Sequence, residues 1–365
     1  MIDLIKKQLL LDLESKTPSL LGKWMPSENT SSQNTRNTAN KIRISMGLSH
    51  KDYRKMLSEL RKRINVLERL MSANRWEEIE FDKIPSKAGL VYKNAFARRD
   101  IIAKQYEAFA KSKDTKVNAD TLYPYEVAYK AVKGGEYSYN FPTLTEVDRH
   151  MIEKYWNNLP DYLGGKPCKI MCVVDTSNSM TGSNASAPIN IAIGLGMYCA
   201  ERIGGAYKNH YISFSRKPQL IKIEGIDFVD KVRRIYRTNL CQNTDLVATF
   251  ELLKQVALKS SPEDRPDTIV VISDMEIDYN SYFSKNSAET EMEAMRKEWE
   301  ACGLTMPKLV YWNVQARQDT ILDAGPNVSY VSGCSPILFE QVIRGVTGYD
   351  LMLEKLNGDR YAAIK

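Results

Sequence analysis

The chain has 365 residues, with 43% hydrophobic and 26% charged residues, which is typical of a globular protein large enough for two domains. No segment approaches the roughly 20 consecutive apolar residues of a membrane-spanning helix, and the N-terminus, MIDLIKKQLLLDLESK, lacks the small-residue cleavage site of a signal peptide. Six scattered cysteines, with neither a CxxC pair nor zinc spacing, indicate buried thiols. We therefore expect a cytoplasmic protein without a membrane partner.

The net charge of +6 belongs to the first part of the chain. Residues 1–150 hold 27 Lys and Arg against 19 Asp and Glu, a net charge of +8, whereas residues 151–365 hold 24 against 26, a net charge of −2. This asymmetry permits a nucleic acid or another anionic partner for the first part alone.

Apolar residues recur at helical spacing from the N-terminus to about Asn158, and strand signals are missing there. A first helix is predicted over Asp3 to Glu14, interrupted by Thr17-Pro18. The polar tract from Ser27 to Thr38 predicts a long loop. Further helices are predicted over residues 86–97, 100–111, 125–132 and 144–158.

A long helix is predicted to begin after Ser49, because this N-cap residue is followed three positions later by Asp52. Its buried face is marked by Tyr53, Met56, Leu57, Leu60, Ile64, Leu67 and Met71. Basic residues fall mostly elsewhere around this helix. They form either a solvated face or a face that contacts the phosphates of RNA, for which the candidates are Arg54, Lys55, Arg61, Lys62 and Arg63.

The pattern changes after the turn-rich segment NLPDYLGGKP at residues 158–167. Apolar runs then alternate with helical stretches, which predicts a mostly parallel, doubly wound sheet. The predicted strands cover residues 169–174, 210–214, 268–273, 308–314 and 328–331. We therefore predict a two-domain α+β protein with a helical domain (1–158), a linker (159–166), an α/β Rossmann-like domain (167–347) and a C-terminal tail or helix (348–365).

The helix after the first strand begins at Pro188, which suits a first helical turn. Gly194 and Gly196 lie within it and are not followed by the Gly-Lys-Ser/Thr of a phosphate-binding loop, so we expect them to allow close helix-to-sheet packing. Its buried stripe is predicted to consist of Ala192, Leu195, Gly196, Cys199 and Ile203.

Oxygen-bearing side chains follow the ends of two predicted strands. Asp175 opens the loop Asp-x-Ser-x-Ser with Ser177 and Ser179, and Asp274 follows the strand 268–273. Thr244 precedes an amphipathic helix whose N-cap is predicted to be Asp245. The carboxyl ends of parallel strands meet at the edge where open α/β folds bind ligands, and hard oxygens suit Mg²⁺ or Mn²⁺. We therefore predict a metal site formed by Asp175, Ser177, Ser179, Thr244 and Asp274.

These five residues resemble, position by position, the metal-ion-dependent adhesion site (MIDAS) of the von Willebrand A family. The resemblance implies an A-domain fold and a bound Mg²⁺ or Mn²⁺ ion that takes an acidic side chain of a protein partner. After Asp274, where many A domains carry glycine, this chain has Met275-Glu276. Glu276 either crowds the site, occupies the open position or faces water; we expect it, with Asp245, in the outer coordination shell.

The chain also resembles an uncharacterised family in which a helical region precedes an A domain. The resemblance rests on five sequence segments: KWMPSENTSS, YRKMLSELRKRINVLERLMS, WEEIEFDKIPSKA, VVISDMEID and YVSGCSP. The architecture is similar to that of the Ro ribonucleoprotein (TROVE) proteins, in which HEAT-like helical repeats form a ring with the A domain and bind RNA. No clean internal repeat is visible in this chain.

Two functions are therefore predicted: metal-dependent binding of an acidic protein partner, and Ro-type RNA binding by the basic helices. A metal that only stiffens the three loops is the structural alternative. We expect no enzyme, because metal hydrolases commonly add a histidine base or a second metal, and none of the three histidines lies in the three loops.

Overall fold

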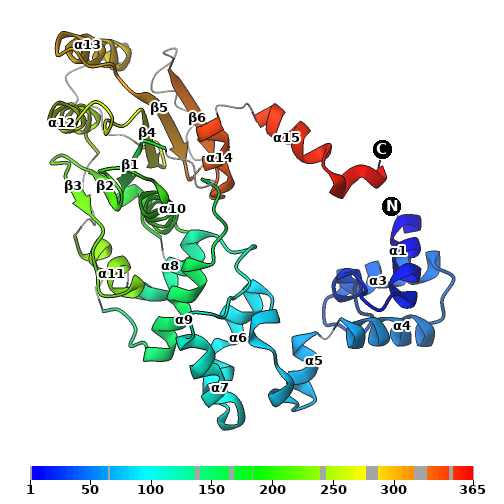
Figure 1. The fold of residues 1–365 in the computed structure, drawn as a ribbon. Coiled ribbons are helices and arrows are strands. Elements are labelled where there is room, and N and C mark those ends of the chain that lie inside the picture. Colours follow the sequence, from blue (N-terminus) through cyan, green and yellow to red (C-terminus); the bar gives the residue numbers. More distant parts are fainter. Residues whose placement is uncertain are drawn as a thin grey trace. The chain divides into compact units, whose positions relative to one another are not determined.

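The computed structural model describes residues 2–64, 66–135, 140–163, 168–182, 184–238, 244–276, 287–315, 327–344 and 348–364 (Figure 1). Parts of the predicted linker and of the predicted boundary near residue 347 lie outside these ranges. The chain divides into two compact units, residues 1–84 with 95–106, and residues 85–94 with 107–365. The predicted domain boundaries themselves stay a prediction.

Helices dominate the chain before residue 170, and within the described residues no strand precedes β1 (Ile170–Asp175). The predicted helical N-terminal region is thereby confirmed. Its helices are α1 (Ile2–Glu14), α2 (Leu21–Trp24), α3 (Gln33–Ser45), α4 (His50–Arg63), α5 (Leu67–Ser72), α6 (Ser86–Arg98), α7 (Asp100–Lys111), α8 (Pro124–Val132) and α9 (Glu146–Asn157), with short 3₁₀ turns η1 (Trp76–Glu78) and η2 (Phe81–Lys83).

The predicted loop from Ser27 to Thr38 is wrong, because α3 begins inside it. Ser32 is the N-cap residue, and its Oγ accepts a hydrogen bond from the Thr35 amide at 3.3 Å. The apolar contacts of α3 come from its second half, where Ala39 is fully buried. The first two turns are polar, so apolar periodicity did not reveal them.

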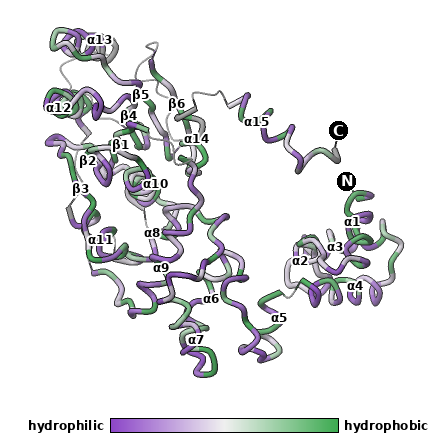
Figure 2. Tube along the Cα trace, viewed as in Figure 1, coloured by the Kyte–Doolittle hydropathy of each residue, from purple (hydrophilic) through white to green (hydrophobic). Residues whose placement is uncertain are grey.

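The long helix predicted through Met71 is two helices, α4 and α5. Its start is as predicted, since the Ser49 Oγ accepts from the Asp52 amide at 3.1 Å. The break comes before α5, where Val66 is extended. Leu67 continues the apolar spacing across the break and is buried, so periodicity alone gave no sign of it. Figure 2 shows hydrophobic and hydrophilic residues alternating along α4.

Six strands form one sheet in the order β3-β2-β1-β4-β5-β6. All neighbours are parallel except β3, which is antiparallel to β2. The five predicted strands are confirmed within one residue at each end, whereas β3 was missed because it has only three residues and is half-exposed. The strands are β1, β2 (His210–Phe214), β3 (Leu220–Lys222), β4 (Thr268–Ser273), β5 (Lys308–Asn313) and β6 (Val328–Ser332).

Helices lie on both faces of this sheet, as the doubly wound prediction requires (Figure 1). One face packs against α12 and α13 in a core cluster that includes Val173, Phe250 and Trp299. The opposite face packs against α10. The remaining elements are η3 (Asn178–Met180), α10 (Pro188–Arg202), α11 (Phe228–Thr238), α12 (Leu246–Lys259), α13 (Ser287–Ala301), α14 (Ile337–Arg344), α15 (Gly348–Leu356) and η4 (Asp359–Ile364). No helix among the described residues combines the length and the apolar character needed to cross a membrane.

The helix α10 is buried around almost its whole circumference, from Pro188 to Ala200. The predicted stripe is therefore too narrow. A Cβ on Gly196 would lie 2.4 Å from the Val174 Cγ2 of β1, which confirms close helix-to-sheet packing there. The same expectation is wrong for Gly194, where a Cβ would lie 2.7 Å from the backbone nitrogen of Tyr125; this glycine allows the close approach of α8 and not of the sheet.

Replacing Gly194 by alanine is expected to lower the free energy of unfolding by about 2 kcal/mol, because the new methyl group meets the α8 backbone rather than a movable side chain. Gly204→Ala is the matched control, since nothing lies within 4 Å of a Cβ built there. Urea unfolding of both variants measures the difference. Equal stability of the two variants would show that α8 is not tightly seated on α10.

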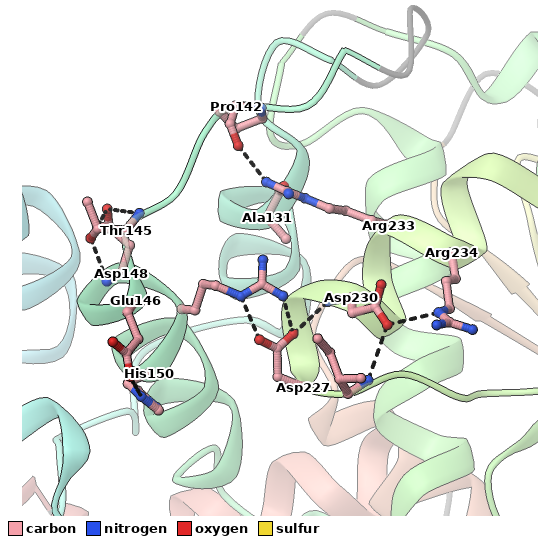
Figure 3. Close-up of polar contacts among 12 residues, drawn as sticks. Ala131, Pro142, Thr145, Glu146, Asp148, His150, Asp227, Asp230, Arg233 and Arg234 are labelled. Carbon is pink, nitrogen blue, oxygen red and sulfur yellow. Dashed lines mark hydrogen bonds and ion pairs between the residues drawn. The ribbon is translucent and has the colours of Figure 1, made fainter.

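Polar contacts fasten α8 and α9 to α11 (Figure 3). Arg149 of α9 donates two hydrogen bonds to the Asp227 carboxylate, with its Nε at 2.6 Å from Oδ2 and its Nη2 at 2.7 Å from Oδ1. Arg233 of α11 donates to the carbonyl oxygens of Ala131 at 2.9 Å and Pro142 at 2.6 Å. The α/β unit therefore has a further helical layer beyond α10.

Candidate metal centre

The first loop of the candidate site begins at the end of β1. Asp175 is fully buried, and its Oδ1 accepts a hydrogen bond from the Ser177 amide at 2.8 Å. This contact turns the chain so that the hydroxyls of Ser177 and Ser179 lie 3.0 Å apart. The spacing Asp-x-Ser-x-Ser thus brings one carboxylate and two hydroxyls together.

The second loop follows β4, the strand next to β1. Val174 pairs with Ile272, so the residues that follow them, Asp175 and Ser273, are neighbours across the sheet. The Ser273 Oγ donates to Asp175 Oδ2 at 2.5 Å. Asp274 comes next and is fully buried.

Two contacts hold Asp274 in place. Its Oδ1 accepts a hydrogen bond from the Glu276 amide at 3.0 Å, and its own amide lies 3.2 Å from the Met180 sulfur of the first loop. The two strand ends therefore form one connected structure, in which Asp175 and Asp274 share a buried environment.

Thr244 brings in the third loop. Its side chain is 1% exposed, and its Oγ1 donates to the Glu276 carbonyl oxygen at 3.4 Å. All three predicted loops thus meet at the carboxyl edge of the sheet, near the end of β1, which lies between β2 and β4. Open α/β folds usually bind their ligands at this edge.

The candidate site contains two buried carboxyl groups, Asp175 and Asp274, and no positive charge pairs with either of them within the described residues. Burial raises the pKa of Asp175 to about 6, and the charge of Asp274 adds to this effect, while hydrogen bonds from Ser273 and Ser177 oppose it. Neither carboxylate forms an ion pair within the described part of the chain. Two buried carboxylates without a counterion are costly.

The Asp274 Oδ2 atom is buried and accepts no hydrogen bond from any described residue. A buried carboxylate oxygen normally has a partner, so this atom fits a cation. Carboxylate and hydroxyl oxygens are the ligands that Mg²⁺ or Mn²⁺ takes. Within the described ranges, no group of three or more His, Cys, Asp and Glu side chains is gathered as a metal site.

Met275 occupies a backbone conformation that favours glycine, with φ of +65°. The Met275 side chain is 3% exposed and belongs to the core cluster of the α12 face, so its burial offsets the backbone strain. Glu276 links the loops through its main chain, by its amide and its carbonyl. The predicted outer-shell role of the Glu276 side chain stays a prediction.

Asp245 is the N-cap of α12, as predicted. Its Oδ1 accepts from the Ala248 amide at 2.9 Å, which gives this carboxylate a structural role. Its place in the outer coordination shell stays a prediction.

Sequence reasoning missed two residues of the same edge. One is Ser273, the last residue of β4, whose hydroxyl donates a hydrogen bond to Asp175. The only sequence signal for it was a single hydroxyl at the end of an apolar strand. Ser215 follows Phe214, which pairs with Asp175, and its buried Oγ has no hydrogen-bond partner among the described residues. The sheet register, which the sequence does not reveal, identifies both.

The candidate phosphate-contacting residues of α4 differ in their surroundings. Arg61 donates to the carbonyl oxygens of Gly22 and Met25, and Arg63 donates to Glu59 and to the Leu13 carbonyl oxygen. The other three are exposed and form no hydrogen bond or ion pair with described residues: Arg54, Lys55 and Lys62. Phosphate contact stays a prediction for all five.

Two family models match the chain. Residues 6–165 match Domain of unknown function (DUF2828), and residues 169–350 match Domain of unknown function (DUF7788). The chain is 29% identical over 317 residues to Uncharacterized protein L728 of Acanthamoeba polyphaga mimivirus, a match that covers 81% of this chain and 52% of that protein. The chain therefore spans about half the length of this curated relative.

Solved structures show distant likenesses. The Ro (RSR) protein of Deinococcus radiodurans is 12% identical, with a TM-score of 0.43 over 93% of this chain and 74% of that one. Manganese-loaded Plasmodium vivax TRAP protein is 11% identical, with a TM-score of 0.31 over 51% and 74% of the two chains, and the SpRpn10 VWA domain is 9% identical, with 0.28 over 48% and 94%. These values are too low to indicate a shared function. Each half of the chain thus matches a family of unknown function, in agreement with an uncharacterised family in which a helical region precedes an α/β domain.

Proposed function

We propose that the chain is a metal-dependent binding protein with a MIDAS-type site. Asp175, Ser177, Ser179, Thr244 and Asp274 would hold Mg²⁺ or Mn²⁺, directly or through water. The ion would supply a double positive charge and an open position for an acidic side chain of a protein partner.

One observation carries this proposal: the buried, unpartnered Oδ2 of Asp274 beside the buried carboxylate of Asp175. Two negative charges against a divalent cation give a nearly neutral centre, and a further carboxylate gains strongly from the nearby ion in a low-dielectric pocket. Arg216 and Lys217 follow the end of β2 at the same sheet edge and are exposed, which favours an acidic partner.

Capture of partners from the native source tests the proposal. The immobilised full chain is expected to retain a protein partner in Mg²⁺ and to release it in EDTA, and the Asp274→Asn variant is expected to capture none. Asp245→Asn is the matched control, because it changes a nearby carboxylate that caps α12, and asparagine caps equally well. Equal recovery with EDTA, or with the Asp274 variant, would contradict a metal-bridged contact.

A second candidate function is RNA binding by the helical region. The observation in its favour is that Arg54, Lys55 and Lys62 of α4 are exposed and without partners among the described residues. This function would not need the metal loops. The RNA measurements described below test it together with a more specific site.

We propose no catalytic role for either site. Within the unit that holds the candidate metal centre, His150 is in α9 beside Glu146, and His210 starts β2 at the sheet edge opposite Asp175. Neither of these two histidines lies at the carboxyl edge where a general base would have to act.

A further inference from the structure

A cavity of about 360 Å³ opens in the first unit, within the size range of small-molecule sites. The α4 helix supplies one wall, the segment after α2 supplies another, and α5 contributes one arginine. The lining residues are Ser27, Glu28, Asn29, Tyr53, Arg54, Leu57, Ser58, Arg61 and Arg69.

The cavity contains two kinds of arginine. Arg61 is half-buried, and each of its guanidinium nitrogens already donates within the protein: Nε to the Gly22 carbonyl oxygen at 3.2 Å, Nη1 to the Ser27 Oγ at 2.9 Å and Nη2 to the Met25 carbonyl oxygen at 2.8 Å. Arg54 and Arg69 are exposed, and neither makes a side-chain hydrogen bond or ion pair with a described residue. The two uncommitted guanidinium groups can donate to a phosphate group, and the nearby Arg61 adds its positive charge.

A buried carboxylate lies in the same cavity. The Glu28 side chain is 7% exposed, and its Oε1 lies 2.9 Å from Arg43 Nε and 2.7 Å from His50 Nδ1. Its Oε2 is buried and accepts no hydrogen bond from any described residue. A simple anion leaves this acceptor unsatisfied, whereas a ligand with an N–H donor satisfies it.

A buried tyrosine holds the floor of the cavity in place. Tyr53 is fully buried, and its hydroxyl donates to the Pro26 carbonyl oxygen at 2.9 Å. A cavity that offers exposed guanidinium groups and a carboxylate acceptor suits a ligand that joins a phosphate to a group with N–H donors, as a nucleotide does.

We propose that this cavity binds a nucleotide, with its phosphate on Arg54 and Arg69 and an N–H group of its base donating to Glu28 Oε2. The ligand is either a free nucleotide or the 5′-terminal nucleotide of an RNA strand, which present the same chemistry. The site needs no metal and goes beyond the metal-dependent function proposed above.

Calorimetric titration of the full chain in EDTA tests the site. Guanosine 5′-monophosphate is expected to bind about tenfold more tightly than guanosine, ribose 5-phosphate or inorganic phosphate, because each of these lacks one contact. The double variant Arg54→Gln, Arg69→Gln is expected to lose about tenfold in affinity. Its matched control is Lys41→Gln, Lys51→Gln, which removes the same charge from exposed positions of α3 and α4 outside the cavity and is expected to bind normally.

The same titration with a short RNA that begins with guanosine separates the two sources. Tighter binding of the 5′-phosphorylated RNA than of the free nucleotide, lost in the arginine variant, assigns the site to RNA ends; equal or weaker binding assigns it to free nucleotides. Equal affinity for ribose 5-phosphate and the nucleotide would overturn the base contact. No binding of the nucleotide, or equal losses in the arginine and lysine variants, would overturn the site.

Discussion

Replacing Asp274 by asparagine is expected to abolish stabilisation of the protein by Mg²⁺ or Mn²⁺ while leaving the metal-free protein as stable as before or more stable. The asparagine Oδ1 can still accept from the Glu276 amide, so the loop keeps its hydrogen bond. The substitution removes one of two buried carboxylates, which relieves repulsion of Asp175 in the metal-free protein. It also removes the unpartnered oxygen that would contact the ion.

Thermal unfolding at increasing metal concentration measures this effect. With a metal concentration 100 times the dissociation constant, the unchanged chain is expected to gain about 2.7 kcal/mol, which raises Tm by several degrees. The Asp245→Asn control is expected to gain as much. A metal-dependent rise in Tm that persists in Asp274→Asn would show that this carboxylate is not a ligand.

Replacing Arg149 by alanine is expected to lower the free energy of unfolding by about 3 kcal/mol at pH 7, because it leaves the largely buried Asp227 carboxylate without its two charged donors. Arg234→Ala is the control. Arg234 pairs with Asp230 at an exposed i,i+4 position on the same helix, so its loss is expected to cost about 0.5 kcal/mol. Similar losses in the two variants would mean that the Arg149 contact does not fasten α9 to α11.

The Arg149 effect is also expected to depend on pH. Burial acts to raise the pKa of Asp227, but the hydrogen bonds from Arg149 and from the Asp230 amide outweigh it, so the pKa is lowered in the folded protein. Stability from this pair is therefore fully present above the unfolded-state pKa of about 3.9 and is lost as pH falls through the lower folded-state value. Urea unfolding should show the gap between the original chain and Arg149→Ala closing at acidic pH.

The sequence predicted the parts of the molecule that depend on local pattern. Continuous apolar runs located the parallel strands, and N-caps such as Ser49 located helix starts, because both signals lie within a few residues. The sequence did not predict the start of α3, because its first turns are polar and show no apolar spacing. It did not predict the break before α5 either, because the apolar spacing continues across that break.

Contacts within the candidate site between residues far apart in the sequence were harder to predict from the sequence. The order of oxygen-bearing residues predicted which loops meet, and the structure brings Asp175, Thr244 and Asp274 together. The contact of Ser273 with Asp175 depends on the pairing of β1 with β4, which no local pattern encodes. The cavity beside Arg54 likewise depends on segments that meet only after folding.

The close approach of α8 to Gly194 has a consequence for dissecting the protein. A fragment cut at the turn-rich boundary near residue 158 would retain α10 but discard the layer that covers its outer side. Ile and Leu side chains of α10 would then become exposed to solvent and would promote self-association. Aggregation of such a fragment would result from the missing helices. Failure of the fragment to bind a ligand would therefore not count against binding by the full chain.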